Sequence, residues 1–306
     1  MYHHSVKRAL SLLIFFLTFY FANAQEDDLF EELNSLVIDE VIYSPPTFKT
    51  LQIANLQSTK MVEEKEFFMV VAHRFGYLKE GVREFYGLDQ ANTKIQFLYG
   101  INKRFQVGVS RDSYEKTYSG TIKIGIKKQS DSFPINLVLY NSMDINTLLN
   151  KLSYPGLLFF DRFAYTTQVL ISRRFSEKLS MEIAAIYVRQ NLIDLNYTKN
   201  LILPSASNLD FITEPWNQYL MAVGGRYKFF KRISLNMDYA YNFSKNKNSL
   251  YFNPFTIGID IETGGHVFQL LFTNSRASND ASFLTETIGN WLNGDVSFGF
   301  NIVRVF

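Results

Sequence analysis

The stretch that decides the fold is Val296-Ser297-Phe298-Gly299-Phe300-Asn301-Ile302-Val303-Arg304-Val305-Phe306. Every second position of this stretch is large and apolar, with Arg304 as the exception: Val296, Phe298, Phe300, Ile302 and Phe306. The intervening positions include Ser297, Gly299 and Asn301. Successive side chains of a β-strand point to opposite faces. One face of this strand therefore suits hydrocarbon, and the other suits small or polar surroundings.

A closing strand with a terminal aromatic residue is similar to the last strand of bacterial outer-membrane β-barrels. This similarity predicts a location in the bacterial outer membrane, and the N-terminus points the same way. Lys7 and Arg8 precede an apolar run of 13 residues, which is followed by Ala22-Asn23-Ala24. The run is too short for a spanning helix of about 20 residues, and the flanks are typical of a secretory signal peptide. An uncleaved membrane anchor is the alternative.

Composition narrows the classes of function. The chain has no cysteine, which excludes disulfides, thiolate metal sites and cysteine nucleophiles. Aromatic residues make up 16% of the chain, as expected where aromatic girdles mark the two interfaces of a membrane barrel. The mean hydropathy is −0.06, and no run of 18 apolar residues follows residue 24. A helical membrane protein would contain such runs.

Charge divides the chain into parts. Residues 25–40 hold seven acidic residues and no basic one. We therefore predict a signal peptide over residues 1–24, an acidic periplasmic segment over 25–46 and an outer-membrane β-barrel over 47–306. The acidic segment is expected to be either a short amphipathic helix or a solvated tail. Its charge, opposite to that of the remainder, suggests a self-contact or a tether.

Alternation with a period of two dominates after residue 46, and the spacing of tight turns and long loops allows a strand count. Barrels of this class have short periplasmic turns and longer external loops. Counting back from the end predicts twelve strands, at 65–76, 91–101, 104–113, 117–128, 134–146, 162–175, 178–190, 217–230, 231–243, 253–263, 265–275 and 292–306. The prediction is thus an all-β, antiparallel, up-and-down transmembrane barrel of about 12 strands, with 14 as the alternative. Thr47–Ser58 resembles a further strand but has the wrong parity, and we expect a periplasmic or lumenal extension there.

If the apolar faces meet lipid, the alternate faces line the lumen. The charged lumen-facing candidates are Lys94, Lys123, Asp144, Arg174, Glu182, Arg226, Lys228, Asp238, Asp260 and Glu262. Two interpretations are open: the charges pair and fill the lumen, which we favour, or they line a pore for a solute. Arg226 and Lys228 are expected to be able to pair with Asp238 across strands. Small residues on the same faces, such as Gly100 and Gly224, leave room for bulky neighbours.

Catalytic patterns are weak, and we predict no catalytic residue, no metal site, no cofactor and no enzyme. Neither His73 nor His266 sits in a metal-binding pattern. An interfacial lipid hydrolase could be imagined from His266, Ser275 and Glu286, but a full strand of about 30 Å separates the histidine from the serine. No basic stripe interleaved with aromatic residues suggests nucleic acid.

The segments carrying a family resemblance include Ile259 to Leu270 (IDIETGGHVFQL), Phe272 to Arg276 (FTNSR), Gly294 to Ile302 (GDVSFGFNI) and His73 to Gly76 (HRFG). Together they resemble an uncharacterised family of Gram-negative outer-membrane β-barrels, a domain of unknown function, over residues 26–306. The resemblance implies a fold and a location, and no activity, ligand or catalytic residue.

The function predicted at this level is general. We expect an integral outer-membrane barrel, porin-like, that passes or binds a small solute. The alternative is a structural or assembly component of an envelope complex. The expected partners are outer-membrane lipid and either an unknown small solute or an envelope protein.

Overall fold

The computed structural model describes residues 45–152, 156–192, 214–247, 249–263 and 266–306. The predicted signal peptide, most of the acidic segment and the Gly264-Gly265 turn lie outside the described residues. Within the described residues, no helix is long and apolar enough to cross a membrane.

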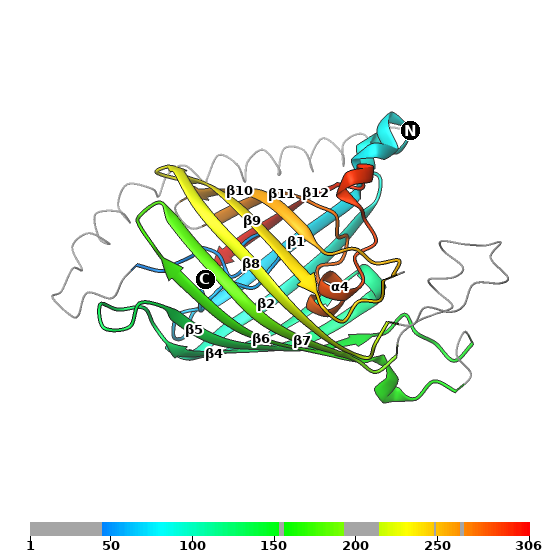
Figure 1. Ribbon diagram of the computed structural model, residues 1–306, viewed down its shortest axis with the longest axis horizontal. Helices are drawn as coiled ribbons and strands as arrows, with labels where there is room; N and C mark the ends of the chain where they lie inside the picture. The colour runs from blue at the N-terminus through cyan, green and yellow to red at the C-terminus, as the bar shows by residue number, and fades with distance from the viewer. Residues whose placement is uncertain (1–44, 153–155, 193–213, 248, 264–265) are drawn as a thin grey trace, which may run out of the picture. The chain divides into compact units, whose positions relative to one another are not determined.

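Twelve antiparallel strands of the described residues form a closed barrel (Figure 1). They are β1 (Phe67–Tyr77), β2 (Ala91–Asn102), β3 (Phe105–Asp112), β4 (Thr117–Lys127), β5 (Asn136–Asn146), β6 (Phe163–Arg174), β7 (Leu179–Gln190), β8 (Asn217–Phe230), β9 (Ile233–Asn242), β10 (Phe255–Thr263), β11 (His266–Thr273) and β12 (Ser297–Val305). Each strand pairs with its neighbour in sequence, and β1 pairs with β12 to close the barrel. The prediction of twelve strands is confirmed, and the alternative of fourteen is wrong.

The last predicted strand begins too early. Residues 292–296 were expected to extend it, but η5 (Trp291–Asn293) is a 3₁₀ turn. The side chain of Asn290 accepts a hydrogen bond from the Leu292 N–H, and Gly294 takes a left-handed conformation with φ 74°. A positive φ is favourable for glycine. The turn ends the loop, and β12 therefore starts at Ser297.

Burial alternates along the strands in the sense opposite to that of a soluble protein. In β9, the residues facing inward are Ser234, Asn236, Asp238, Ala240 and Asn242, all of them buried. The exposed positions between them include Met237, Tyr239 and Tyr241. Large apolar residues are exposed in the same way on most strands. Such an outer surface suits lipid, and the polar groups inside need partners within the barrel.

The two ends of the barrel differ in their connections. At the tight-turn end, residues 103–104, 128–135, 175–178 and 231–232 connect consecutive strands, and Thr263 of β10 pairs with His266 of β11. The long-loop end carries the other connections, among them η2 (Leu78–Gly87), η3 (Tyr114–Lys116) and η4 (Phe159–Arg162). The start of β1 and the end of β12 lie at the tight-turn end, where Phe68 is paired with Val305. That the tight-turn end faces the periplasm stays a prediction.

Residues 47–62, here called the lumenal hairpin, fold inside the barrel from the tight-turn end (Figure 1, blue). The hairpin turns at its tip, where the Ile53 N–H donates to the Leu56 carbonyl at 2.8 Å and the Ser58 N–H donates to the Leu51 carbonyl at 3.0 Å. Thr47–Ser58 contains one isolated bridge, Gln52 with Gln57, and is not the further strand that its pattern resembled. Apart from these bonds within the hairpin, several of its backbone groups bond to side chains of the wall.

Residues 274–290, here called the inner loop, enter the barrel from the long-loop end. The loop contains the short helix α4 (Asp280–Thr285), whose six residues are all buried. The side chain of Asn279 caps the helix by accepting from the Ser282 N–H at 2.9 Å. The sequence predicted an external loop here. It leaves the wall at the expected end but folds inward, because Ala281, Phe283 and Leu284 bury apolar side chains against the wall.

Candidate functional site

The lumen is the candidate site. Within it, Asp238 on β9 binds three consecutive backbone N–H groups of the hairpin tip. One carboxylate oxygen, Oδ2, accepts from the backbone N–H groups of Ala54 (3.1 Å), Asn55 (2.7 Å) and Leu56 (3.0 Å). Asp238 is 2% exposed. Hydrogen bonds to an ionised acceptor are stronger than neutral ones. Asp238 therefore holds the hairpin tip by its backbone.

Arg74 on β1 holds the tip from another side. Its guanidinium donates to the Asn55 side-chain oxygen and, at 2.9 Å, to the side-chain oxygen of Asn301 on β12. Asn301 in turn donates to the Ala54 carbonyl at 3.1 Å. The hairpin tip is thereby bound to both strands that close the barrel.

The two legs of the hairpin contact charged residues of other strands. The Lys123 ammonium donates to the carbonyls of Ser58 (3.0 Å) and Lys60 (3.3 Å). Glu182 accepts from the Thr59 N–H at 2.9 Å. Buried backbone groups require hydrogen-bond partners. These wall charges supply partners to a segment that has no regular secondary structure of its own.

The inner loop is held by a second set of wall side chains. Asp112 on β3 accepts from the Ser278 N–H at 3.1 Å, and the Lys94 ammonium on β2 donates to the Ser278 carbonyl at 2.9 Å. The hydroxyl of Tyr140 donates to Asp280 Oδ2 at 2.7 Å. Asp144 Oδ2 accepts from the Ala281 N–H at 3.3 Å.

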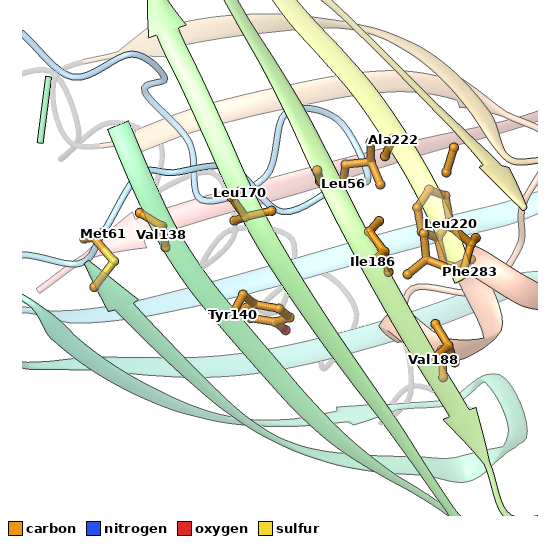
Figure 2. Close-up of a cluster of buried hydrophobic side chains, with 14 residues drawn as sticks. Leu56, Met61, Val138, Tyr140, Leu170, Ile186, Val188, Leu220, Ala222 and Phe283 are labelled. Carbon is orange, nitrogen blue, oxygen red and sulfur yellow. The ribbon is translucent and has the colours of Figure 1, made fainter. Parts of the chain in front are cut away.

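The hairpin and the inner loop meet in the lumen. Gln57 of the hairpin donates to Asp280 Oδ1 of the inner loop at 3.1 Å. Figure 2 shows Leu56 and Phe283 in one apolar cluster with wall residues such as Leu220 and Ile186. Two segments that enter from opposite ends thus fill the lumen together.

Of the ten charged residues predicted to face the lumen, seven are buried: Lys94, Lys123, Asp144, Glu182, Arg226, Asp238 and Asp260. Lys123, Glu182 and Asp238 contact the hairpin, whereas Lys94 and Asp144 contact the inner loop. Asp260 accepts from Gln269 at 2.8 Å. Any role of these residues toward a solute stays a prediction.

The remaining predicted residues lie toward the tight-turn end. Arg226 forms an ion pair with Glu262, which also lies 3.7 Å from the Lys49 ammonium of the hairpin. Arg174 and Lys228 are partly exposed. The expected pairing of Arg226 or Lys228 with Asp238 is not what the register gives, because Asp238 lies opposite Gly224 and Arg226 lies opposite Asn236.

Four titratable residues with lumenal contacts described above escaped the sequence prediction: Arg74, Asp112, Tyr140 and Asp280. The alternation along β1, β3 and β5 could have predicted that Arg74, Asp112 and Tyr140 face inward, because each lies on the same face of its strand as other buried residues. Asp280 carries no such signal, because it lies in a loop without periodicity. The described buried residues include seven carboxylates and only four basic side chains.

Two lumen-facing glycines make room for the hairpin. A Cβ at Gly100 would lie 1.9 Å from the Glu63 carbonyl oxygen, and a Cβ at Gly224 would lie 2.4 Å from the Ile53 Cδ1 atom. The first contact is with backbone, and the second is with the end of a flexible side chain. Gly100 is therefore the stricter requirement for the path of the chain between hairpin and β1.

The lumen contains small cavities. One, of about 10 Å³, lies between the hairpin and the wall and is lined by residues that include Gln57, Gln96 and Tyr140. Another, of about 40 Å³, lies between the inner loop and the long-loop ends of β4 to β7 and is here called the mouth cavity. A single water needs about 10–15 Å³. These cavities have the size of one to a few water molecules.

The three residues considered for a hydrolase are spread over the barrel. His266 begins β11 at the tight-turn end, and Ser275 follows the other end of that strand. Glu286 is the C-cap residue of α4 and accepts from Gln190 at 2.6 Å. In the part of the chain that the structure describes, no group of three or more His, Asp or Glu side chains could hold a metal ion. The absence of an enzymatic activity stays a prediction.

Comparison with known proteins gives one family and several distant structures. A family model described as a membrane-bound β-barrel domain (DUF5777) matches residues 48–306. No curated protein matches the chain. The NanC porin is 8% identical and has a TM-score of 0.46, with 78% of this chain and 98% of that chain covered.

Two further structures show the same level of similarity. The COG4313 outer membrane channel from Pseudomonas putida F1 is 12% identical, covers 81% of this chain and 97% of that chain, and has a TM-score of 0.44. Outer membrane phospholipase A from Escherichia coli is 10% identical and has a TM-score of 0.42, with 80% of this chain and 94% of that chain covered. At these identities, the activities named for those proteins belong to those proteins alone.

Proposed function

Since this chain belongs to the DUF5777 family of membrane-bound β-barrel domains, we propose that it acts in the bacterial outer membrane as a gated barrel. In this proposal, the lumen is closed as described, and a small polar solute passes when the lumenal hairpin withdraws. Outer-membrane lipid surrounds the exposed apolar face. The proposal assigns no chemical reaction to the barrel.

The observation that carries the proposal is the course of the hairpin. Its first leg is at the tight-turn end, where Thr47 contacts Asn136 and Lys49 lies near Glu262. Its second leg returns to the same end, where the Val62 N–H donates to Gln106 at 2.8 Å. Because both legs reach one end, the hairpin can withdraw there without any chain terminus passing through the barrel.

The chemistry of the hairpin contacts also supports withdrawal. Asp238, Lys123 and Glu182 bind backbone groups of the hairpin, and water can replace those groups at each of them. Polar contacts exchanged for water change the free energy by far less than their strength in a dry interior. The inner loop, which is joined to β11 and β12, must shift as well for a continuous path to form.

Conductance measurements on the full chain in planar bilayers test the proposal. We expect the native chain to be closed most of the time and Asp238→Ala to raise the open fraction at least tenfold, because three backbone N–H groups lose their acceptor. Lys228→Gln is the matched control, because it removes a partly exposed charge on the adjacent strand β8.

A labelling experiment shows whether the hairpin is the part that moves. The chain has no cysteine, and Ala54 is 2% exposed. We expect Ala54→Cys to react slowly with a maleimide in the otherwise native chain and much faster beside Asp238→Ala. Rapid labelling of Ala54→Cys beside Asp238→Ala, without any conductance, would contradict the proposed passage of a solute. It would still show that the hairpin moves.

A structural or assembly component is the second candidate, and the filled lumen favours it. Cavities of about 10 and 40 Å³ are too small for a hydrated solute. In this case, no hairpin variant conducts, and removing residues 25–46 releases an envelope partner in a pull-down. If the same proteins are captured without residues 25–46, the acidic segment does not hold the envelope partner.

A further inference from the structure

The mouth cavity contains two buried polar atoms that no described group satisfies. Asp144 Oδ1 and Asn279 Nδ2 have no hydrogen-bond partner among the described residues. Asp144 is 3% exposed, Asn279 is 1% exposed, and both line this cavity. A buried polar atom without a partner is costly, above all one that belongs to a carboxylate. Both atoms therefore call for an occupant of the cavity.

The orientation of Asn279 is fixed by its own contacts. Its Oδ1 atom accepts from the Ser282 N–H at 2.9 Å to cap α4. The amide nitrogen is consequently the group left over, and it can only donate. Asp144 uses Oδ2 to accept from Ala281, so its Oδ1 atom is the acceptor left over. The cavity thus offers one anionic acceptor from the wall and one neutral donor from the inner loop.

The charges around the cavity favour a cation. Four carboxylates line it: Glu115, Asp144, Asp161 and Glu286. Arg162 is the basic side chain among the described lining residues, and its guanidinium donates to the Leu149 carbonyl. Glu115 accepts from Asn146 at 2.9 Å, and Asp161 accepts from the Leu158 N–H at 2.8 Å. Carboxylates in excess over basic groups attract positive charge into a confined space.

The size of the cavity and the shape of the donor set narrow the class of cation. A volume of about 40 Å³ accepts one to a few non-hydrogen atoms. The lack of a metal-binding group of three or more side chains in the described residues argues against a divalent ion. A primary ammonium group fits, because its N–H donors can reach Asp144 Oδ1 and neighbouring oxygens.

We propose that the mouth cavity binds the primary ammonium group of a small cationic solute between Asp144 on β5 and Asn279 on the inner loop. Binding at this site does not depend on conduction. That the bound group belongs to the solute that passes the barrel rests on the proposed function. The occupant contacts both the wall and the inner loop, so its binding is linked to the position of that loop.

Calorimetric titration of the full chain in detergent micelles tests the site, with methylammonium chloride as the probe. Tetramethylammonium chloride is the control of equal charge that is too large for the cavity, and sodium chloride keeps the ionic strength constant. We expect saturable binding of methylammonium near one per chain and none of tetramethylammonium. Water alone in the cavity would give no saturable heat for methylammonium, and this result would overturn the proposal.

Two variants change the site in different ways. Asp144→Asn removes the charge at nearly constant volume, and Ala164→Leu fills the cavity and keeps the carboxylate, since Ala164 also lines it. Each is expected to weaken binding at least tenfold, whereas Asp260→Asn, a buried acid outside the cavity, leaves it unchanged. Native affinity in both site variants would contradict the assignment. If methylammonium binds but the barrel never conducts, the proposed passage of a solute is wrong and the ammonium site stands.

Discussion

The lumenal hairpin and the inner loop fill the same barrel by different means. The hairpin lacks regular structure, so its backbone N–H and carbonyl groups take partners from the wall, such as Asp238 and Lys123. The inner loop also takes wall partners for the backbone of Ser278 and Ala281. In addition, α4 forms hydrogen bonds of its own and buries apolar side chains, with Phe283 in the apolar cluster (Figure 2). The difference explains the wall: its charges are largely ligands for an irregular backbone.

The strongest test of this contrast is to remove an apolar contact of α4. Phe283→Ala should lower the free energy of unfolding by about 3–5 kcal/mol, because the 3% exposed ring leaves a cavity behind. Urea titration followed by tryptophan fluorescence measures the loss. If the two segments are held independently, Ala54→Cys in the hairpin keeps its slow labelling rate in this background. Fast labelling there would mean that the inner loop also holds the hairpin.

A smaller effect is expected from the polar contact of α4 with the wall. Tyr140→Phe removes the hydroxyl that donates to Asp280 at 2.7 Å and should cost about 2 kcal/mol, as for hydrogen bonds to charged groups. The same titration serves as the measurement, and Tyr241→Phe on the exposed face of β9 is the control. A loss as large as that of Phe283→Ala would reverse the ranking of apolar and polar contacts in the inner loop.

The smallest effect concerns the contact between the two segments. A double-mutant cycle with Gln57→Ala and Asp280→Asn should give a coupling energy of roughly 0.5–1 kcal/mol, since the two side chains share one hydrogen bond of 3.1 Å. Additive losses would mean that the segments merely lie side by side. A coupling well above this range would make the two segments a single cooperative gate.

The sequence predicts the wall well, because a single period of two governs it. Alternation in β4, β7 and β9 is sufficient to turn Lys123, Glu182 and Asp238 inward, and a count of tight turns fixes their number and order. Gly100 and Gly224 also carry a readable signal, since small inward residues indicate that something else occupies the space.

The contents of the lumen could not be predicted in the same way. Residues 47–62 have no internal hydrogen-bond ladder, so their place depends on side chains that are distant in sequence, such as Asp238 for Asn55. Asp280 lies in a loop whose exit from the wall is predictable but whose direction is not. That direction is set by where Phe283 and Leu284 can be buried, which is a property of the closed barrel.

The anchors of the hairpin tip have a consequence for the time course of folding. Arg74 and Asn301 lie on β1 and β12, the two strands whose pairing closes the barrel. Ala54 and Asn301 are 247 positions apart, and contacts of such separation form late because a long loop must first close. Seam closure and the seating of the hairpin tip are therefore both expected late in folding, and they share the side chains of Arg74 and Asn301. The wall therefore closes around the hairpin. A nascent barrel without the hairpin tip lacks the polar groups of Ala54 and Asn55 that bind both β1 and β12.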